Sequence, residues 1–261
     1  MKYGFIGCGN MGSAIAKALS KTTNDILISD RSGKAKKLAE ELGCNYRSAE
    51  TVALECDRIF LAVKPQMMAS VLQPLQSAFQ ARRPLLITMA AGLTIEQIEN
   101  MAGTSLPVIR IMPNTPVAVG CGMTQYCFNE RVDQKVLESF LSDMKYCGTL
   151  DFLDEGQINA ASALSGCGPA YMYMFIEALA DGAVACGVPR AKAIEYAAAT
   201  MIGSAEMVLQ TGLHPGKLKD AVCSPGGSTI AGLQVLEAQG FRGTVMDCIC
   251  AAYKRNQELG K

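Results

Sequence analysis

Residues 3–12 read YGFIGCGNMG, and this stretch decides how the first half of the chain folds. It opens with the apolar run Tyr3–Ile6, which predicts a buried strand. Gly7, Gly9 and Gly12 follow in the spacing G-x-G-x-x-G, at the start of a stretch with helical apolar spacing. A strand that turns into a helix through such glycines is typical of a dinucleotide-binding site, although the motif alone also fits a plain tight turn.

The sequence after the glycines favours a dinucleotide site over a plain turn. A second apolar run ends at Asp30, which follows Gly7 at about the spacing that a ribose-contacting acid has in a Rossmann fold. Gly7 would permit the turn, Gly9 would let the backbone approach a pyrophosphate, and Gly12 would let the helix pack on the strand. The N–H groups at the start of that helix would bind the phosphates.

The residues around Asp30 leave the type of nicotinamide cofactor open. Asp30 favours a free ribose 2′-hydroxyl and repels a 2′-phosphate. Arg31, Ser32 and Lys34, by contrast, form a donor cluster of the kind that accepts a 2′-phosphate. Both NADPH and NADH therefore stand as candidates.

Two later loops are expected at the same edge of the sheet, because each follows a predicted strand. They are Ala62-Val63-Lys64-Pro65 and Met89-Ala90-Ala91-Gly92. Lys64 has two interpretations, a solvated surface lysine or a contact to the nicotinamide ribose or phosphate. Its position between a strand and Pro65 favours the contact.

Strands alternate with helices through residues 1–153, which predicts βαβ units and a parallel sheet with helices on both faces. The expected strands are Tyr3–Ile6, Asp25–Ser29, Arg58–Val63, Pro84–Met89 and Pro107–Met112. The expected helices are Met11–Ser20, Lys34–Leu42, Met67–Gln80 and Ile95–Met101, the last entered through a capping box of Thr94 and Gln97. A coda follows, with Gly120–Phe128, a helix over Val132–Asp143, and Lys145–Phe152. Residues 1–153 are thus expected to form an α/β Rossmann domain with a doubly wound, mostly parallel sheet.

Residues 154–261 show helical patterns and no convincing strand, which predicts an all-α domain. The expected helices are Glu155–Ser165, Pro169–Gly187, Arg190–Thr211, Gly216–Val222, Thr229–Gln239 and Phe241–Leu259. Ala and Gly dominate Ala191–Gly203, and such small side chains let helix backbones approach closely. A bundle this small with so much apolar surface is expected to pack against a second copy of itself.

Two glycine- and proline-containing stretches lead directly into helices of this second half. They are Leu164–Tyr171 and Val222–Thr229. Each exposes backbone N–H groups at the positive end of a helix and supplies hydroxyl groups, which suits a small anion such as a carboxylate. The alternative is helix capping by Ser and Thr without any ligand. Because two such loops share a chain with a cofactor motif, we favour a carboxylate pocket.

Composition restricts the classes of partner. The 24 basic and 24 acidic side chains give a net charge of zero, so no electrostatic argument supports a nucleic-acid or membrane partner. The apolar run Tyr171–Val188 contains Glu177 and Asp181, which argues against a membrane span. The 11 cysteines are scattered without a C-x-x-C pair, a pattern that predicts reduced thiols in a cytoplasmic protein.

The chemistry that the sequence lacks is also informative. His214 is the only histidine, and its Gly- and Pro-rich surroundings predict a capping or surface role. Motifs for a metal site or a serine nucleophile are missing, as are the His–acid pair of 2-hydroxy-acid dehydrogenases and the lysine-centred helix of 3-hydroxy-acid dehydrogenases. Reduction of a C=N bond fits this pattern, because a protonated imine is already electrophilic and mainly needs alignment with a hydride.

Five motifs in order resemble those of the pyrroline-5-carboxylate reductase family, and the similarity runs from end to end. They are FIGCGNM (5–11), AVKP (62–65), RIMPNTP (110–116), LSGCGPAY (164–171) and DAVCSPGGSTIAGL (220–233). The resemblance implies hydride transfer from NAD(P)H to 1-pyrroline-5-carboxylate, which gives L-proline in the last step of proline biosynthesis. It also implies a C-terminal dimerisation domain, an active site where the cofactor of one subunit meets helices of both, and homodimers that assemble into a decamer, a pentamer of dimers.

The resemblance also assigns residues to the two ligands. Those expected to contact the cofactor are Ile6, Gly7, Cys8, Gly9, Asn10, Met11, Arg31, Ser32, Ala62, Val63, Lys64, Pro65, Met89, Ala90 and Ala91. Those expected to bind the substrate are Glu155, Val222, Ser224, Gly226, Gly227, Ser228 and Thr229. Thr229 is the candidate catalytic residue, since its hydroxyl would hold the carboxylate or the ring nitrogen.

Two positions depart from the family pattern. Some relatives carry an acid where this chain has Gly212 and an asparagine where it has Ala221, so neither side chain contributes here. The alternatives to the main interpretation are another imine or 3-hydroxy-acid reductase on the same scaffold, and a nucleotide-sensing protein that keeps the fold without the chemistry. The complete Ser224–Thr229 loop disfavours both.

Overall fold

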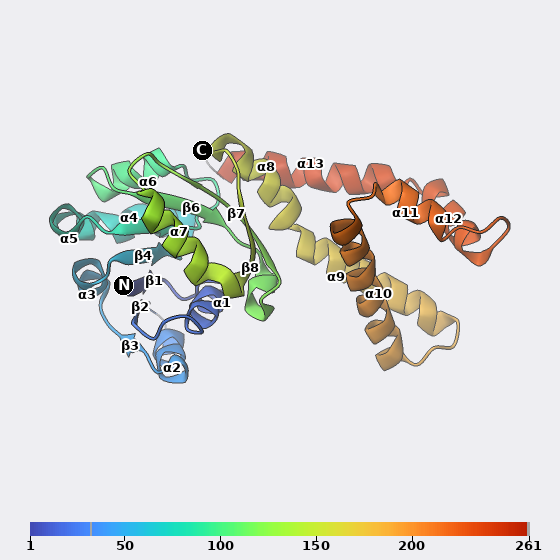
Figure 1. The fold of residues 1–261 in the computed structure, drawn as a ribbon, viewed down its shortest axis with the longest axis horizontal. Helices are drawn as coiled ribbons and strands as arrows, with labels where there is room; N and C mark the ends of the chain where they lie inside the picture. Colours follow the sequence, from blue (N-terminus) through green and yellow to red (C-terminus); the bar gives the residue numbers. More distant parts are fainter. Residues whose placement is uncertain (32, 260–261) are drawn as a thin grey trace. The chain divides into compact units, whose positions relative to one another are not determined.

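The computed structural model describes residues 1–31 and 33–259, and its contacts divide the chain into two compact units (Figure 1). The first unit comprises Met1–Cys167 together with the chain from Ala252 onward, and the second comprises Gly168–Ala251. The change from strands to helices falls where the sequence predicts it, since the first helix after the last strand begins at Glu155. A domain boundary between residues 153 and 154 stays a prediction.

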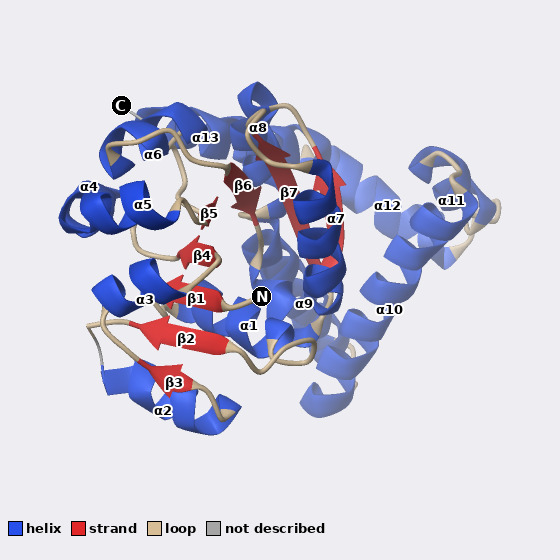
Figure 2. Cartoon of the chain, turned by 60° about the vertical axis from the view of Figure 1, so that its left-hand side comes forward, coloured by secondary structure: helices blue, strands red, loops and turns tan. Residues whose placement is uncertain are grey.

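The first unit is built on an eight-stranded sheet, seen in Figure 2. Its strands are β1 (Tyr3–Ile6), β2 (Ile26–Ser29), β3 (Asn45–Tyr46), β4 (Arg58–Leu61), β5 (Leu85–Thr88), β6 (Val108–Met112), β7 (Gly122–Phe128) and β8 (Gly148–Phe152). Their order is β3-β2-β1-β4-β5-β6-β7-β8, and in the described part of the chain only the β6–β7 pair is antiparallel. The predicted doubly wound, mostly parallel sheet is thereby confirmed.

Helices pack on both faces of this sheet (Figure 2). One face carries α1 (Asn10–Leu19), α2 (Gly33–Leu42) and α7 (Gln134–Asp143). The other carries α3 (Ala49–Glu55), α4 (Met68–Leu72), α5 (Gln76–Arg82), α6 (Ile95–Ala102) and α8 (Glu155–Ser165). The capping box predicted for α6 is present, with the Thr94 hydroxyl accepting from the Gln97 N–H and the Gln97 side chain accepting from the Thr94 N–H.

The strands β1, β2, β4, β5 and β6 are mostly apolar because both of their faces are buried. Phe5 belongs to the core on the α1 side, whereas its neighbour Ile6 belongs to the core on the α3 side. The same alternation separates Ile26 and Ile28 from Leu27. Side chains of successive strand residues point to opposite faces, so a strand covered on both sides loses the alternating polar positions of a half-exposed strand.

β3 and α3 are not predicted from the sequence, and one predicted helix corresponds to two in the structure. β3 holds two residues and has no apolar run of its own. The expected helix Met67–Gln80 is divided into α4 and α5 by a short 3-10 segment, Gln73–Leu75, that contains Pro74. Proline lacks the N–H that a continuing α-helix needs, so the helix is interrupted there.

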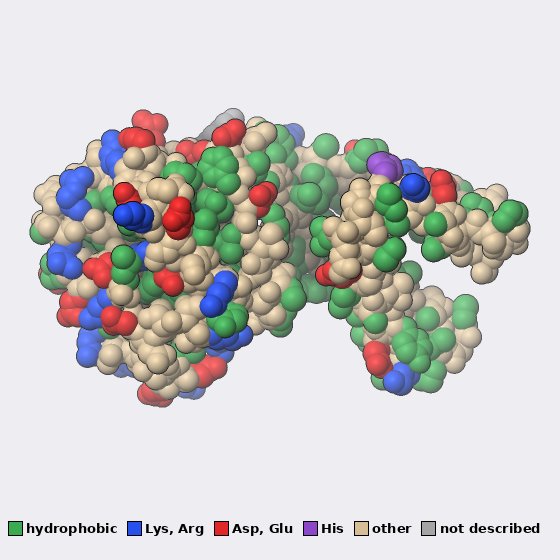
Figure 3. All heavy atoms as spheres, in the orientation of Figure 1, with side chains coloured by type: hydrophobic (Ala, Val, Ile, Leu, Met, Phe, Trp, Pro, Cys, Tyr) green, Lys and Arg blue, Asp and Glu red, His purple; other side chains and the backbone are tan. Residues whose placement is uncertain are grey.

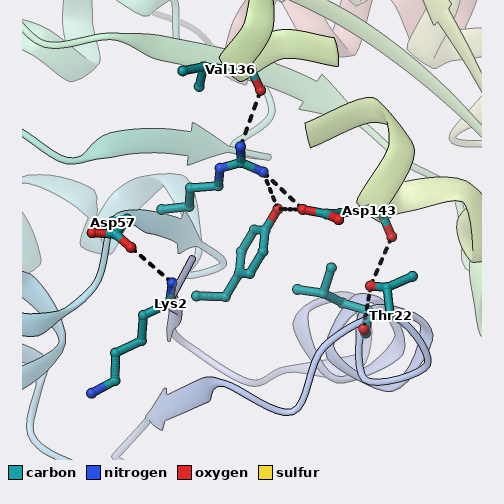
Figure 4. Close-up of polar contacts among 8 residues, drawn as sticks. Lys2, Thr22, Asp57, Val136 and Asp143 are labelled. Atoms are coloured by element: carbon teal, nitrogen blue, oxygen red, sulfur yellow. Dashed lines mark hydrogen bonds and ion pairs between the residues drawn. The ribbon is translucent and has the colours of Figure 1, made fainter. Parts of the chain in front are cut away.

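A buried polar cluster fixes α7 to the sheet at the end opposite the glycine turn (Figure 4). Arg58, at the start of β4, is 1% exposed, and its Nη1 donates to an Asp143 carboxylate oxygen at 3.0 Å. The Tyr3 hydroxyl donates to the same oxygen at 2.6 Å. Burial, more than any other cause, raises the pKa of Tyr3, so the phenol stays a neutral donor. An uncompensated buried arginine is costly, and the cluster avoids that cost.

The second unit is helical across residues 168–251. It contains α9 (Gly168–Ala185), α10 (Arg190–Thr211), α11 (Pro215–Ala221), α12 (Ser228–Ala238) and most of α13 (Phe241–Leu259). The predicted helices agree with these to within a few residues at each end. The apolar run that begins at Tyr171 lies in α9, and among the described residues no helix is both long and apolar enough to span a membrane.

This second unit covers very little of its own apolar surface. Of its residues, the buried ones are three alanines, Ala180, Ala193 and Ala197. Large apolar side chains stay exposed, and Figure 3 shows apolar atoms gathered over these helices. The most exposed include Tyr173, Met174, Tyr196, Ile202, Leu209, Val235 and Met246. So much uncovered apolar surface is typical of a region that another protein surface covers.

Candidate functional site

The glycine turn joins β1 to α1 and requires glycine at two of its positions. Gly7 has a φ of +96°, and a Cβ placed there would lie 2.7 Å from the carbonyl carbon of Ala62. A Cβ at Gly12 would lie 2.8 Å from the backbone oxygen of Gly7. The tight turn at Gly7 and the close helix packing at Gly12 therefore have the geometry that the sequence predicts.

Gly9 differs from its two neighbours, because a Cβ there would meet no described atom within 4 Å. It is the N-cap of α1, and a glycine has no side chain that could cap the first turn of that helix. The backbone N–H groups at this helix start thus face open space next to a residue without a side chain. This cradle fits a pyrophosphate, which binds helix N-termini through such N–H groups.

A pocket of about 640 Å³ opens beside the turn and is lined by seven of the 15 predicted cofactor residues. Those among its lining are Ile6, Gly7, Gly9, Arg31, Ala62, Val63 and Lys64. An adjoining pocket of about 530 Å³ shares Gly9 and Asp30 and is lined also by Cys8 and Asn10. The carboxyl ends of β1, β2 and β4 meet at this edge, which is where open α/β sheets bind their ligands.

The remaining predicted cofactor residues line neither pocket, and one lies outside the described residues. Met11, Pro65, Met89, Ala90 and Ala91 line neither pocket, and Ser32 is the residue outside the described part of the chain. Five further lining residues are not predicted from the sequence: Tyr46, Glu50, Met67, Ser70 and Val71. Only their position could have indicated them, because Tyr46 ends β3 and the others follow the carboxyl end of β3 or β4.

Cys8 places a neutral thiol in the turn. Burial raises the pKa of Cys8 to about 12, and the negative charge of Asp30 adds to the rise. The thiol therefore stays protonated at neutral pH and adds no negative charge beside a bound phosphate. The backbone N–H of Cys8 donates to Oδ2 of Asp30 at 2.6 Å.

Glu155, predicted to contact the substrate, lies in a network within the first unit. Its Oε1 accepts from the Ile95 N–H at 2.8 Å and from Nη1 of Arg110 at 3.1 Å. Arg110 is 1% exposed, and its Nη2 donates to Oδ1 of Asn159 at 2.9 Å. The network joins β6, α6 and α8. Contact between Glu155 and a substrate stays a prediction.

The predicted substrate loop, Val222–Thr229, ends at the start of α12. The N-cap of α12 is Gly227, and no side chain caps it. The hydroxyl residues Ser224, Ser228 and Thr229 are exposed. Capping by Ser or Thr does not account for this loop, so the first-turn N–H groups and the nearby hydroxyls suit a small anion.

His214 has the capping role that the sequence predicts. It is the N-cap of α11, and its Nδ1 accepts a hydrogen bond from the Gly216 N–H at 3.0 Å.

Comparison with known proteins identifies the family. A family model described as pyrroline-5-carboxylate reductase dimerisation matches residues 155–259, and one described as NADP oxidoreductase, coenzyme F420-dependent, matches residues 2–92. The chain is 41% identical to the pyrroline-5-carboxylate reductase of Escherichia coli K12, over 100% of this chain and 98% of that protein. It is 37% identical to that of Arabidopsis thaliana, over 100% and 96%.

Solved structures agree with these relatives. The pyrroline carboxylate reductase of Plasmodium falciparum with NADP bound superposes with a TM-score of 0.91 at 35% identity, covering 100% of this chain and 98% of that one. The enzyme of Streptococcus pyogenes gives a TM-score of 0.91 at 35% identity, with coverage of 99% and 98%. This chain belongs to the pyrroline-5-carboxylate reductase family.

Proposed function

We infer that this chain reduces 1-pyrroline-5-carboxylate to L-proline with NADPH, the last step of proline biosynthesis. The relative from Escherichia coli, named pyrroline-5-carboxylate reductase, matches this chain over its full length, and the Plasmodium structure holds NADP. The observation that carries the inference is a pair of uncapped helix N-termini, α1 at the open position of Gly9 and α12 beside exposed hydroxyls. One suits a dinucleotide phosphate and the other a carboxylate.

On this proposal the glycine turn and its neighbours bind the cofactor, which supplies the hydride when bound. Backbone N–H groups from Gly9 to Met11 hold the pyrophosphate, while the backbone of Ile6, Gly7 and Cys8 shapes the turn beneath it. Arg31 with Ser32 takes the adenosine ribose end. Residues 62–65 and 89–91 flank the nicotinamide. The neutral thiol of Cys8 keeps added negative charge away from the phosphates.

The substrate is held, on the same proposal, by the loop that enters α12. The loop residues are Val222, Ser224, Gly226, Gly227, Ser228 and Thr229. The helix N-terminus and the hydroxyls bind the carboxylate, and the Thr229 hydroxyl contacts the carboxylate or the ring nitrogen. An imine that is anchored in this way needs alignment more than activation, so positioning provides most of the rate enhancement.

Replacing Thr229 by alanine tests this role. We expect Thr229→Ala to lower turnover by more than about tenfold, which corresponds to about 1.4 kcal/mol of lost transition-state stabilisation. Thr229→Ser keeps the hydroxyl and should retain most of the activity. Thr229 is exposed, so neither variant should alter thermal unfolding of the free protein. Steady-state oxidation of NADPH measures turnover, and unchanged kinetics for Thr229→Ala would remove the residue from the mechanism.

The activity itself is tested by one assay. NADPH and then NADH are incubated with the protein, with and without pyrroline-5-carboxylate, and the loss of reduced cofactor is followed by absorbance. Substrate-dependent oxidation with formation of proline is the expected result. Its absence with both cofactors would refute the proposed function.

The helical second unit supports self-association, because it matches the dimerisation family model and leaves its large apolar side chains uncovered. We propose a homodimer, with five dimers assembling into a decamer. All 11 cysteines are free thiols, which suits a reducing compartment, and we propose that the enzyme works in the cytoplasm. Sedimentation equilibrium across a concentration range tests the assembly, and a monomer at every concentration would refute it.

A further inference from the structure

Asp30 conflicts with the use of NADPH. An acid after the second strand of a Rossmann fold accepts the free ribose 2′-hydroxyl and opposes a 2′-phosphate. In this chain Asp30 directly follows β2 and borders both pockets beside the glycine turn. The contacts of this residue resolve the conflict.

The Asp30 carboxylate is attached to the glycine turn. Its Oδ2 accepts the N–H of Cys8 at 2.6 Å, between the two glycines of the turn. A hydrogen bond to an ionised carboxylate is about twice as strong as a neutral one. The backbone on either side is tied as well, because the Gly7 N–H donates to the Ser29 oxygen at 2.8 Å. The Tyr46 hydroxyl donates to the backbone oxygen of Asp30 at 2.7 Å.

We propose that Asp30 is a positioning residue of the glycine turn and does not select between the two nicotinamide cofactors. Through the Cys8 amide it fixes the backbone that receives the pyrophosphate, a part that NADPH and NADH share. Selection of the 2′-phosphate then falls to Arg31, whose exposed side chain lines the larger pocket. The inference rests on the proposed function, since it requires that the dinucleotide binds at this turn.

Two substitutions separate the hydrogen bond of Asp30 from its charge. Asp30→Asn keeps an oxygen that accepts from Cys8 but removes the charge, whereas Asp30→Ala removes both. Calorimetric titration without substrate gives the Kd of each variant for NADPH and for NADH. For Asp30→Ala we expect both Kd values to rise about tenfold, with their ratio unchanged to within about threefold. For Asp30→Asn we expect both Kd values to stay within about threefold of the unmodified chain.

Arg31→Ala serves as the matched control. It should weaken NADPH at least about tenfold and leave NADH unchanged, because it removes a contact to the 2′-phosphate alone. A tenfold change in the NADPH:NADH ratio for Asp30→Asn would overturn the inference and assign cofactor selection to Asp30. If Asp30→Ala unfolds, as thermal unfolding of the free protein would show, the Asp30→Asn titrations decide alone. If the unmodified chain binds neither dinucleotide, the proposed function fails, and this inference fails with it.

Discussion

Gly9→Ala is expected to weaken NADPH binding about 100-fold while leaving the fold intact, a loss of about 2.8 kcal/mol. The added methyl group meets no described atom within 4 Å, so it projects into the space that a pyrophosphate needs. It would push the phosphates away from the first-turn N–H groups of α1, and several charge-assisted hydrogen bonds would lengthen together. Calorimetric titration of the free enzyme with NADPH measures the loss.

The stability of the same variant distinguishes this effect from misfolding. Gly9 has a φ of −66° and a ψ of −173°, which alanine adopts without strain, so the melting temperature should stay the same or rise slightly. Gly7→Ala should instead destabilise the protein, because its φ is +96° and its Cβ would collide with Ala62. Gly156→Ala, at an open and exposed helical position, is the control that should alter neither the fold nor binding. NADPH binding by Gly9→Ala within about threefold of the unmodified chain would contradict the proposed cradle.

Local patterns predicted most of the fold, because each element carries its own signal. The apolar run Tyr3–Ile6 and the capping box at Thr94 are read directly from neighbouring residues, and both appear in the structure. α12 starts at Ser228, one residue before its predicted start at Thr229. The failures are elements that lack such a signal, such as β3, whose two residues form a strand only by pairing with β2.

The full set of residues that line the pocket could not be predicted, because it depends on contacts between segments far apart in the sequence. Tyr46 and Met67 line the same pocket as Gly9, because the sheet order places β3, β2, β1 and β4 side by side. That order is a property of the assembled sheet. The contacts of Asp30 and Glu155 are similarly long-range, so a sequence motif identified both residues while leaving the partners of their carboxylates unknown.

Glu155→Ala is expected to destabilise the protein by about 3 kcal/mol, because it leaves the guanidinium of Arg110 buried without its carboxylate partner. Arg110 is 1% exposed, so water cannot readily take the place of the lost carboxylate. Its Nε already has no hydrogen-bond partner within the described structure. The Ile95 N–H would also lose its acceptor at the start of α6. At roughly 2–4 °C per kcal/mol for a protein of this size, the melting temperature should fall by roughly 6–12 °C.

A double-mutant cycle identifies the buried charge as the cause. Arg110→Met in the Glu155→Ala background removes that charge. The free energy of unfolding lost by the double variant should therefore be smaller, by at least about 1 kcal/mol, than the sum of the losses of the two single variants. Glu41→Ala breaks the exposed ion pair with Lys17 and, as a surface control, should cost less than about 1 kcal/mol. The alternative, that Glu155 acts only on the substrate, predicts an unchanged melting temperature with a raised KM for pyrroline-5-carboxylate. The melting temperature is measured on the free protein without either ligand. A lowered value for Glu155→Ala therefore supports the structural role, and an unchanged value supports the role on the substrate alone.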